Sequence, residues 1–129
     1  MNPRMLPAAI WAMSLLFVST AQAERPPESP EDATHVVVGQ VESVFSYETR
    51  SDVHYVVKIV VEQMEKGAGY QAGDAFYAEC FQRKKSAPRI PAAYGHQSVP
   101  KSGQRIRAYV IRDGSRCEGI YPKWFDGLK

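Results

Sequence analysis

Cysteine is scarce in this sequence, and what is missing around it excludes several kinds of chemistry. Cys80 and Cys117 are the two cysteines among 129 residues, and they do not form a C-x-x-C pair, which argues against a thiol redox site. The three histidines have no His, Cys or carboxylate at the spacing of a metal motif. Gly67-Ala68-Gly69 lacks the Lys and the following helix of a phosphate-binding loop. We therefore expect no metal, no cofactor and no phosphate-loop chemistry.

None of the histidines stands in a context that identifies a catalytic group. His35 begins a predicted strand and His54 lies on the mixed face of another, so we expect both to be structural or exposed. His96 lies in a long loop and is the most plausible functional histidine, but no nucleophile accompanies it in a recognisable pattern. A small hydrolase is therefore the least favoured function class, and we expect a protein that is not an enzyme.

The apolar start of the chain is too short for a membrane span. Residues 1–23 begin with a basic segment around Arg4, continue with an apolar run from Ala8 to Val18 and end in Ala21-Gln22-Ala23. A basic start, about 7–15 apolar residues and an A-x-A end are typical of a cleaved secretory signal, whereas a membrane helix needs about 20 residues. We expect cleavage before Glu24, export to the periplasm or the medium, and no transmembrane segment in the mature chain. An uncleaved N-terminal anchor is the alternative.

The mature part is long enough for one small domain. Residues 24–33 hold three prolines and four acidic residues, which predicts a disordered or extended leader, and residues 34–129 then form the domain. Because a small domain buries only about 60–68% of its unfolded surface, a disulfide would stabilise it, by roughly 4 kcal/mol for the loop between the two cysteines. Exported proteins keep disulfides. We expect a Cys80–Cys117 bridge, with two buried free thiols as the alternative.

Alternating apolar and polar residues predict an all-β domain. In the longest run, residues 53–65, the odd positions from Val53 to Val61 are all apolar, which predicts one buried face. We expect this strand to bend, because most strands have about five or six residues. Gly39 inside the first strand indicates a bulge or a bend there. The other predicted strands cover residues 34–45, 74–81, 104–112 and 116–121, and residues 122–129 form a tail that closes the core with Trp124 and Phe125.

A long interruption follows the third predicted strand. Residues 82–103 contain three prolines and two glycines and do not alternate like a strand. Five strands with an interruption after the third resemble the OB fold, a small Greek-key barrel. The resemblance implies a five-stranded OB-like barrel with a long loop or short helix between strands three and four. It also implies that the third strand lies beside the fifth, which would bring Cys80 near Cys117. A seven-stranded sandwich is the competitor, but we find five strands.

The opening strands resemble a narrower group of OB-like proteins. Residues Ala33-Thr34-His35-Val36-Val37-Val38-Gly39-Gln40-Val41-Glu42-Ser43-Val44, followed by a long strand that ends in Glu65-Lys66-Gly67, are similar to netrin-like and metalloproteinase-inhibitor modules. The resemblance implies the barrel and, as an alternative function, a protease inhibitor that acts through its N-terminal edge. Those inhibitors use an N-terminal cysteine as a metal ligand, and no cysteine precedes Cys80 here. The inhibitory mechanism therefore does not carry over.

Charge is divided unevenly along the mature chain. Residues 24–80 have 11 acidic and 4 basic side chains, whereas residues 81–129 have 11 basic and 3 acidic ones. Either the two halves neutralise each other within the fold, or the second half leaves a basic face for an anionic partner. The candidate ligand-binding residues lie in the long loop and at its two ends: Arg83, Lys84, Lys85, Arg89, Lys101, Arg105 and Arg107.

Aromatic residues near these cations widen the choice of ligand. Phe81, Tyr94 and Tyr109 are close in sequence, and cations beside aromatic rings suit sugars or single-stranded nucleic acid. Export argues against nucleic acid and favours an acidic polysaccharide, an anionic lipid headgroup or an acidic protein. The leading hypothesis is thus an exported, non-catalytic binding module that presents a basic loop to an anionic ligand or a protein partner. A solvated basic face without a partner is the alternative.

Overall fold

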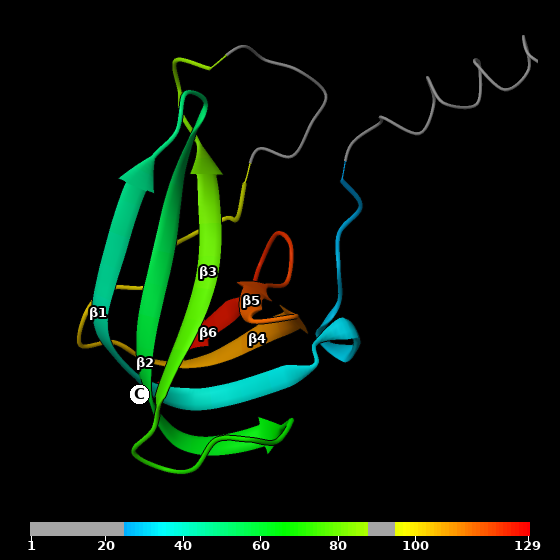
Figure 1. Ribbon diagram of the computed structural model, residues 1–129, viewed down its shortest axis with the longest axis vertical. Coiled ribbons are helices and arrows are strands. Elements are labelled where there is room, and N and C mark those ends of the chain that lie inside the picture. Colours follow the sequence, from blue (N-terminus) through cyan, green and yellow to red (C-terminus); the bar gives the residue numbers. More distant parts are fainter. Residues whose placement is uncertain (1–24, 88–94) are drawn as a thin grey trace, which may run out of the picture. The chain divides into compact units, whose positions relative to one another are not determined.

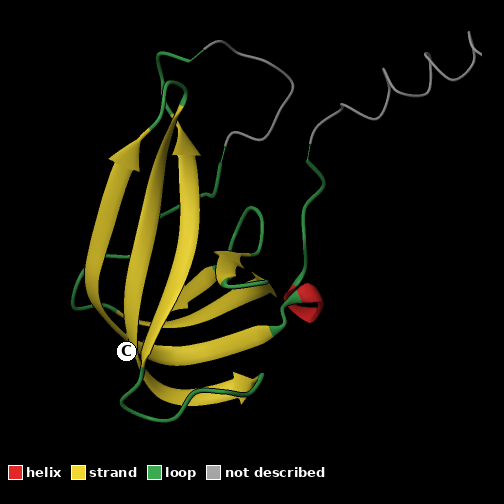
Figure 2. Cartoon of the chain, viewed as in Figure 1, coloured by secondary structure: helices red, strands yellow, loops and turns green. Residues whose placement is uncertain are grey.

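The computed structural model describes residues 25–87 and 95–129 (Figure 1). The predicted signal segment, Arg89 and Tyr94 therefore lie outside the described residues. Within the described ranges, one short 3-10 helix, η1, is the helical element (Figure 2), and no helix there has the length and apolarity to cross a membrane. The strands are β1 (His35–Glu48), β2 (Asp52–Lys66), β3 (Ala75–Arg83), β4 (Arg105–Asp113), β5 (Arg116–Gly119) and β6 (Phe125–Gly127).

Five of the strands close into a barrel. The hydrogen-bonded order is β1-β2-β3-β5-β4, and β4 pairs back onto β1. β3 and β5 run parallel, with Glu79 opposite Glu118, whereas the other pairs are antiparallel. This order confirms the predicted five-stranded, OB-like Greek-key barrel. β6, which the alternation pattern did not predict, adds a short strand beside β4. The described parts of the β3–β4 connection, residues 84–87 and 95–104, contain no helix.

A sharp change of direction in β1 separates the barrel from an extension. Residues His35–Gln40 pair with β4, while β1 pairs with β2 up to Glu48, with a register shift between Val41 and Ser43. A Cβ at Gly39 would collide with the carbonyl oxygen of Val60, so glycine is required where the two strands approach closely. The irregularity predicted at Gly39 is confirmed as a bulge, since the register with β2 shifts between Val38 and Gly39. Beyond it, β1, β2 and β3 continue together as a three-stranded sheet (Figure 1).

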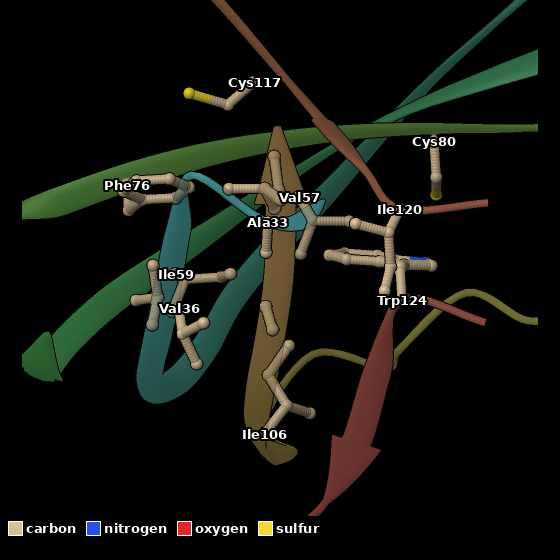
Figure 3. Close-up of a cluster of buried hydrophobic side chains, with 14 of the residues drawn as sticks. Ala33, Val36, Val57, Ile59, Phe76, Cys80, Ile106, Cys117, Ile120 and Trp124 are labelled. Atoms are coloured by element: carbon tan, nitrogen blue, oxygen red, sulfur yellow. The ribbon is translucent and has the colours of Figure 1, made fainter. Parts of the chain in front are cut away.

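The core lies between the inward faces of these strands. The odd positions Val57 and Ile59 of β2 are fully buried, as predicted. Trp124, from the chain segment before β6, is also buried (Figure 3), and its indole N–H donates to the carbonyl oxygen of Ser98 at 3.2 Å. A Cβ at Gly119 would collide with the Trp124 ring, so this glycine makes room for the tryptophan. The tail therefore closes the core, as its aromatic residues indicated.

The predicted disulfide is wrong, because both cysteines are buried free thiols. The parallel register places Glu79 level with Glu118, which sets Cys80 level with Gly119 and leaves Cys117 two residues out of step. With ordinary strand spacings, that offset puts the two Cα atoms roughly 8 Å apart, and disulfides rarely span more than about 7 Å. Figure 3 shows the two sulfur atoms at separate places around the core cluster.

The residues before β1 follow the barrel wall. The backbone N–H of Glu28 donates to the carbonyl oxygen of Tyr121 at 2.6 Å, and the Tyr121 N–H donates to the Glu28 carboxylate at 2.9 Å. The helix η1 (Pro30–Asp32) follows, and Ala33 is buried in the core. The acidic, proline-rich leader is thus extended in part, and these contacts tie its second half to the domain.

Candidate functional site

The first cations of the predicted basic loop lie at the tip of the β1–β2 hairpin. Arg83 is opposite Asp52 across the β2–β3 pair. The backbone N–H of Lys84 donates to the carbonyl oxygen of Ser51 at 2.8 Å, and its ammonium lies 3.8 Å from the Glu48 carboxylate. Arg83 Nε and Asp52 Oδ1 are both buried and have no hydrogen-bond partner. The exposed Lys85 continues this group, which we call the hairpin-end cations.

The arginines of β4 lie elsewhere and already have partners. Arg105 Nε is 2.8 Å from the Glu62 carboxylate, and Arg107 Nε is 2.5 Å from that of Glu65. The hydrogen bond from Arg107 to Glu65 raises the pKa of the guanidinium. Since Glu62 follows Asp52 by ten residues, about 33 Å of strand separates the β4 arginines from the hairpin-end cations along β2. The predicted basic residues therefore form two groups.

Two further ion pairs join the acidic half of the chain to itself or to the basic half, while Lys123 pairs with Asp126 within the basic half. Arg116 of β5 donates two hydrogen bonds to the Glu79 carboxylate of β3, at 3.0 and 2.9 Å. Lys58 lies 2.6 Å from Glu42 across the β1–β2 pair. Lys101, in the loop before β4, is exposed. Much of the charge asymmetry is thus neutralised inside the fold. This favours mutual neutralisation of the two halves over a continuous basic face.

A second surface lies on the outward face of the three-stranded extension, and sequence reasoning missed it. Three large apolar side chains are markedly exposed in the described residues: Phe45 at 56%, Tyr47 at 51% and Tyr77 at 50%. The strand registers place all three on the same face. We call this surface the outer aromatic face. Its three cross-strand rows are Ser43–Lys58–Tyr77, Phe45–Val56–Glu79 and Tyr47–His54–Phe81.

The Tyr47–His54–Phe81 row of this face is held together by ring contacts. The Tyr47 and His54 rings stack with centroids 5.0 Å apart and an interplanar angle of 10°. His54 and Phe81 follow at 6.0 Å, and the edge of the row meets His96 at 5.3 Å from Phe81. The Arg116–Glu79 pair borders the rings with charge. The face thus combines aromatic rings with charged side chains, since Glu79 lies between Tyr77 and Phe81 on β3.

The sequence contains the alternation that forms this face, but the predicted first strand ended too early to include all of it. The first strand was predicted to stop at residue 45, with a loop over residues 46–52. β1 instead continues to Glu48, and the turn occupies residues 49–51. Phe45 and Tyr47 therefore alternate with Val44 and Ser46 within a strand. Read as a strand, Phe-Ser-Tyr would have placed two aromatic rings on the face opposite the core.

His96, the histidine considered most plausible for function, has a structural role in this arrangement. Its side chain is only 3% exposed. Nδ1 accepts a hydrogen bond from the backbone N–H of Phe81 at 3.2 Å, and Nε2 donates to the carbonyl oxygen of Gly119 at 2.8 Å. A neutral imidazole satisfies both bonds at once. The His96 side chain thus links the β3–β4 connection to β3 and β5 through hydrogen bonds.

Two grooves among the described residues are further candidates. One, of about 390 Å³, is lined by Glu42 and Glu62, but both carboxylates are engaged by cations. The other, of about 260 Å³, lies between Glu28 and Asp126. In residues 25–87 and 95–129, no three His, Cys, Asp or Glu side chains gather as a metal site would require. Neither groove therefore offers a stronger site than the outer aromatic face.

Comparison with protein-family models, with curated proteins and with solved structures found no match. The likeness to OB proteins therefore rests on strand order and closure, which the structure shows directly. The netrin-like resemblance of residues 33–67 gains no support beyond the barrel itself.

Proposed function

We propose that this chain is an exported, non-catalytic binding module, and that it contacts a protein partner through the outer aromatic face. The observation that carries the proposal is the position of Phe45, Tyr47 and Tyr77 on one face of one sheet. Contiguous exposed apolar surface with a polar margin is typical of interaction sites. Aromatic side chains at the centre of such a surface contribute most of the binding energy.

The placement of the face also supports the proposal. OB barrels commonly bind ligands over strands two and three and the neighbouring loops, and the outer aromatic face covers β2 and β3. Tyr77 and Phe81 of β3 and His54 of β2 all belong to it. The face is close to neutral, since Lys58 and Glu79 each have an opposite charge beside them. A protein surface fits such a face better than a polyanion does.

An anionic ligand remains the second candidate because of the hairpin-end cations. Arg83 lies next to the Tyr47–His54–Phe81 row, and Lys85 is exposed at the same end. An acidic polysaccharide, an anionic lipid headgroup or an acidic protein would bind there through charge, so its affinity would fall steeply with added salt. The protease-inhibitor alternative gains less support, because residues Glu28 and Ala33 are held against the barrel.

One capture experiment separates these candidates. The mature protein is immobilised and exposed to the envelope and extracellular fraction of its own source at low and at high salt. The double variant Tyr47→Ser/Tyr77→Ser should lose the captured partner at both salt concentrations, and Lys84→Glu/Lys85→Glu should keep it. The opposite pattern, with capture that is lost at high salt, would replace the aromatic-face proposal by the anionic-ligand one. Capture that survives in both variants would reject both sites.

A further inference from the structure

The outer edge of β1 lacks a neighbouring strand over its last six residues. β4 pairs with β1 only from His35 to Gln40, and the backbone of Val41 is bonded to Gly103 and Gln104. Residues 43–48 then pair with β2 on one side, and no strand of the described chain lies on the other (Figure 1). Six residues leave roughly 20 Å of strand edge open.

The backbone groups on this edge point outward at every second residue. In the turn, the Thr49 N–H donates to the carbonyl oxygen of Asp52 at 2.8 Å. Because bonded and non-bonded pairs alternate along an antiparallel ladder, Val44, Ser46 and Glu48 direct their N–H and C=O groups away from β2. Residues 43–48 contain neither Pro nor Lys, the residues that often protect an edge strand from pairing.

We propose that this edge pairs antiparallel with the same edge of a second copy of the chain, with Ser46 opposite Ser46 on the two-fold axis. This register sets Phe45 opposite Tyr47 of the second copy, twice per dimer, because the axis relates the two strands. Cross-strand aromatic pairs stabilise a sheet. Val44 faces Glu48 of the second copy, so no two carboxylates lie directly opposite each other.

A two-fold register centred on Phe45 is less favourable. Placing Phe45 opposite Phe45 keeps the backbone groups in phase, but it sets Glu42 opposite Glu48 of the second copy on both sides of the axis. Like charges directly opposite each other destabilise a sheet. Of these two registers, the charges of the strand therefore favour the one centred on Ser46.

Such pairing joins the two three-stranded extensions into one continuous sheet. The outer aromatic faces become neighbours, because Phe45 and Tyr47 lie on the outward side of β1 in both copies. The inference goes beyond the proposed function and does not depend on it: a dimer can form whether or not a partner binds to the face.

Analytical ultracentrifugation of the mature protein over a range of concentrations tests the association. We expect a reversible shift from monomer to dimer, and we expect Phe45→Ser to weaken the dimer at least tenfold. Tyr77→Ser is the matched control, since Tyr77 is equally exposed on the same face but lies on β3, away from the edge. A protein that stays monomeric at every concentration, or a dimer that Phe45→Ser leaves unchanged, overturns the proposal.

Engineered cross-linking tests the register. Phe45→Cys and Tyr47→Cys are prepared as separate proteins, and the native thiols do not compete because Cys80 and Cys117 are buried. Facing residues of a non-bonded antiparallel pair lie about 4.5 Å apart at Cα, within disulfide range. Under mild oxidation, we expect a covalent dimer when the two proteins are mixed and none from either alone. Cross-linking of Phe45→Cys with itself, or none in the mixture, overturns the register.

Discussion

The imidazole Nε2 of His96 donates a hydrogen bond to the carbonyl oxygen of Gly119 at 2.8 Å, so a loop residue holds β5 in place. The same ring accepts the backbone N–H of Phe81. One buried side chain therefore satisfies backbone groups of two neighbouring strands, β3 and β5. These strands meet in the described structure through a single parallel bridge, Glu79 to Glu118, so barrel closure at this point depends strongly on the histidine.

Replacing His96 by Ala should therefore destabilise the barrel. The change leaves the Phe81 N–H and the Gly119 C=O buried without their partner, and each loss costs about 1–3 kcal/mol. We expect a lower midpoint in urea unfolding followed by circular dichroism. His54→Ala is the control, because His54 is partly exposed and its ring contacts lie on the outer aromatic face. Equal midpoints for the two variants would show that His96 does not hold the strands together.

The free thiols lead to a second prediction. Burial raises the pKa of Cys80 to about 12, with the Glu118 charge adding to the effect, and desolvation also raises the pKa of Cys117. Because the thiolate is the reactive form, neither residue should react with a thiol reagent in the native protein at pH 8. In denaturant without reductant, two thiols per chain should react. A count of zero in denaturant would show a disulfide.

The same pKa shift predicts a fall in stability at high pH. The unfolded chain releases the Cys80 proton near pH 9, whereas the folded chain keeps it up to about pH 12. Between these values the unfolded state binds fewer protons, so the free energy of unfolding should decrease as the pH rises, by up to about 1.4 kcal/mol per pH unit. The full contribution is present below pH 9.

Comparison of the wild type with Cys80→Val isolates this effect from the titration of lysines and tyrosines. The difference in the free energy of unfolding between the two proteins, measured in urea from pH 8 to pH 11, should shift in favour of the variant. A difference that stays constant over this range would mean that the Cys80 thiol ionises equally in both states.

Much of the barrel was predictable because its strands carry local signals. The odd positions of β2 are apolar from Val53 to Val61, which buries Val57 and Ile59, and Gly39 marks where β1 approaches β2 closely. β6 was missed because Phe125–Gly127 is too short for a periodic pattern to show. The order of the strands came from resemblance to the OB fold, since nothing local specifies which strands become neighbours.

The candidate site was harder to predict because it depends on register between distant strands. The disulfide failed for this reason: β3 and β5 are neighbours as expected, but their parallel register separates Cys80 from Cys117 by two residues. The basic residues were grouped by nearness in sequence, whereas β4 carries Arg105 and Arg107 to carboxylates of β2. A count of charge shows the imbalance, and only the fold shows which charges meet.

The pairing of Arg107 with Glu65 provides the last prediction, because it decides whether the β4 arginines are available to a ligand. Both side chains are about one-third exposed and share two hydrogen bonds, from Arg107 Nε and Nη2. Arg107→Glu should lower the free energy of unfolding, since it places a second carboxylate opposite that of Glu65 on the surface. The exchanged double variant Arg107→Glu/Glu65→Arg should recover most of that loss.

A double-mutant cycle in urea, completed with Glu65→Arg, measures the coupling between the two side chains. A favourable coupling energy is expected for the pair, and it should shrink at high salt because screening weakens the attraction. A coupling near zero at low salt would mean that Arg107 is free to bind an anion. The β4 arginines would then be available to a basic ligand site, and the charge of Arg107 would not be neutralised by Glu65.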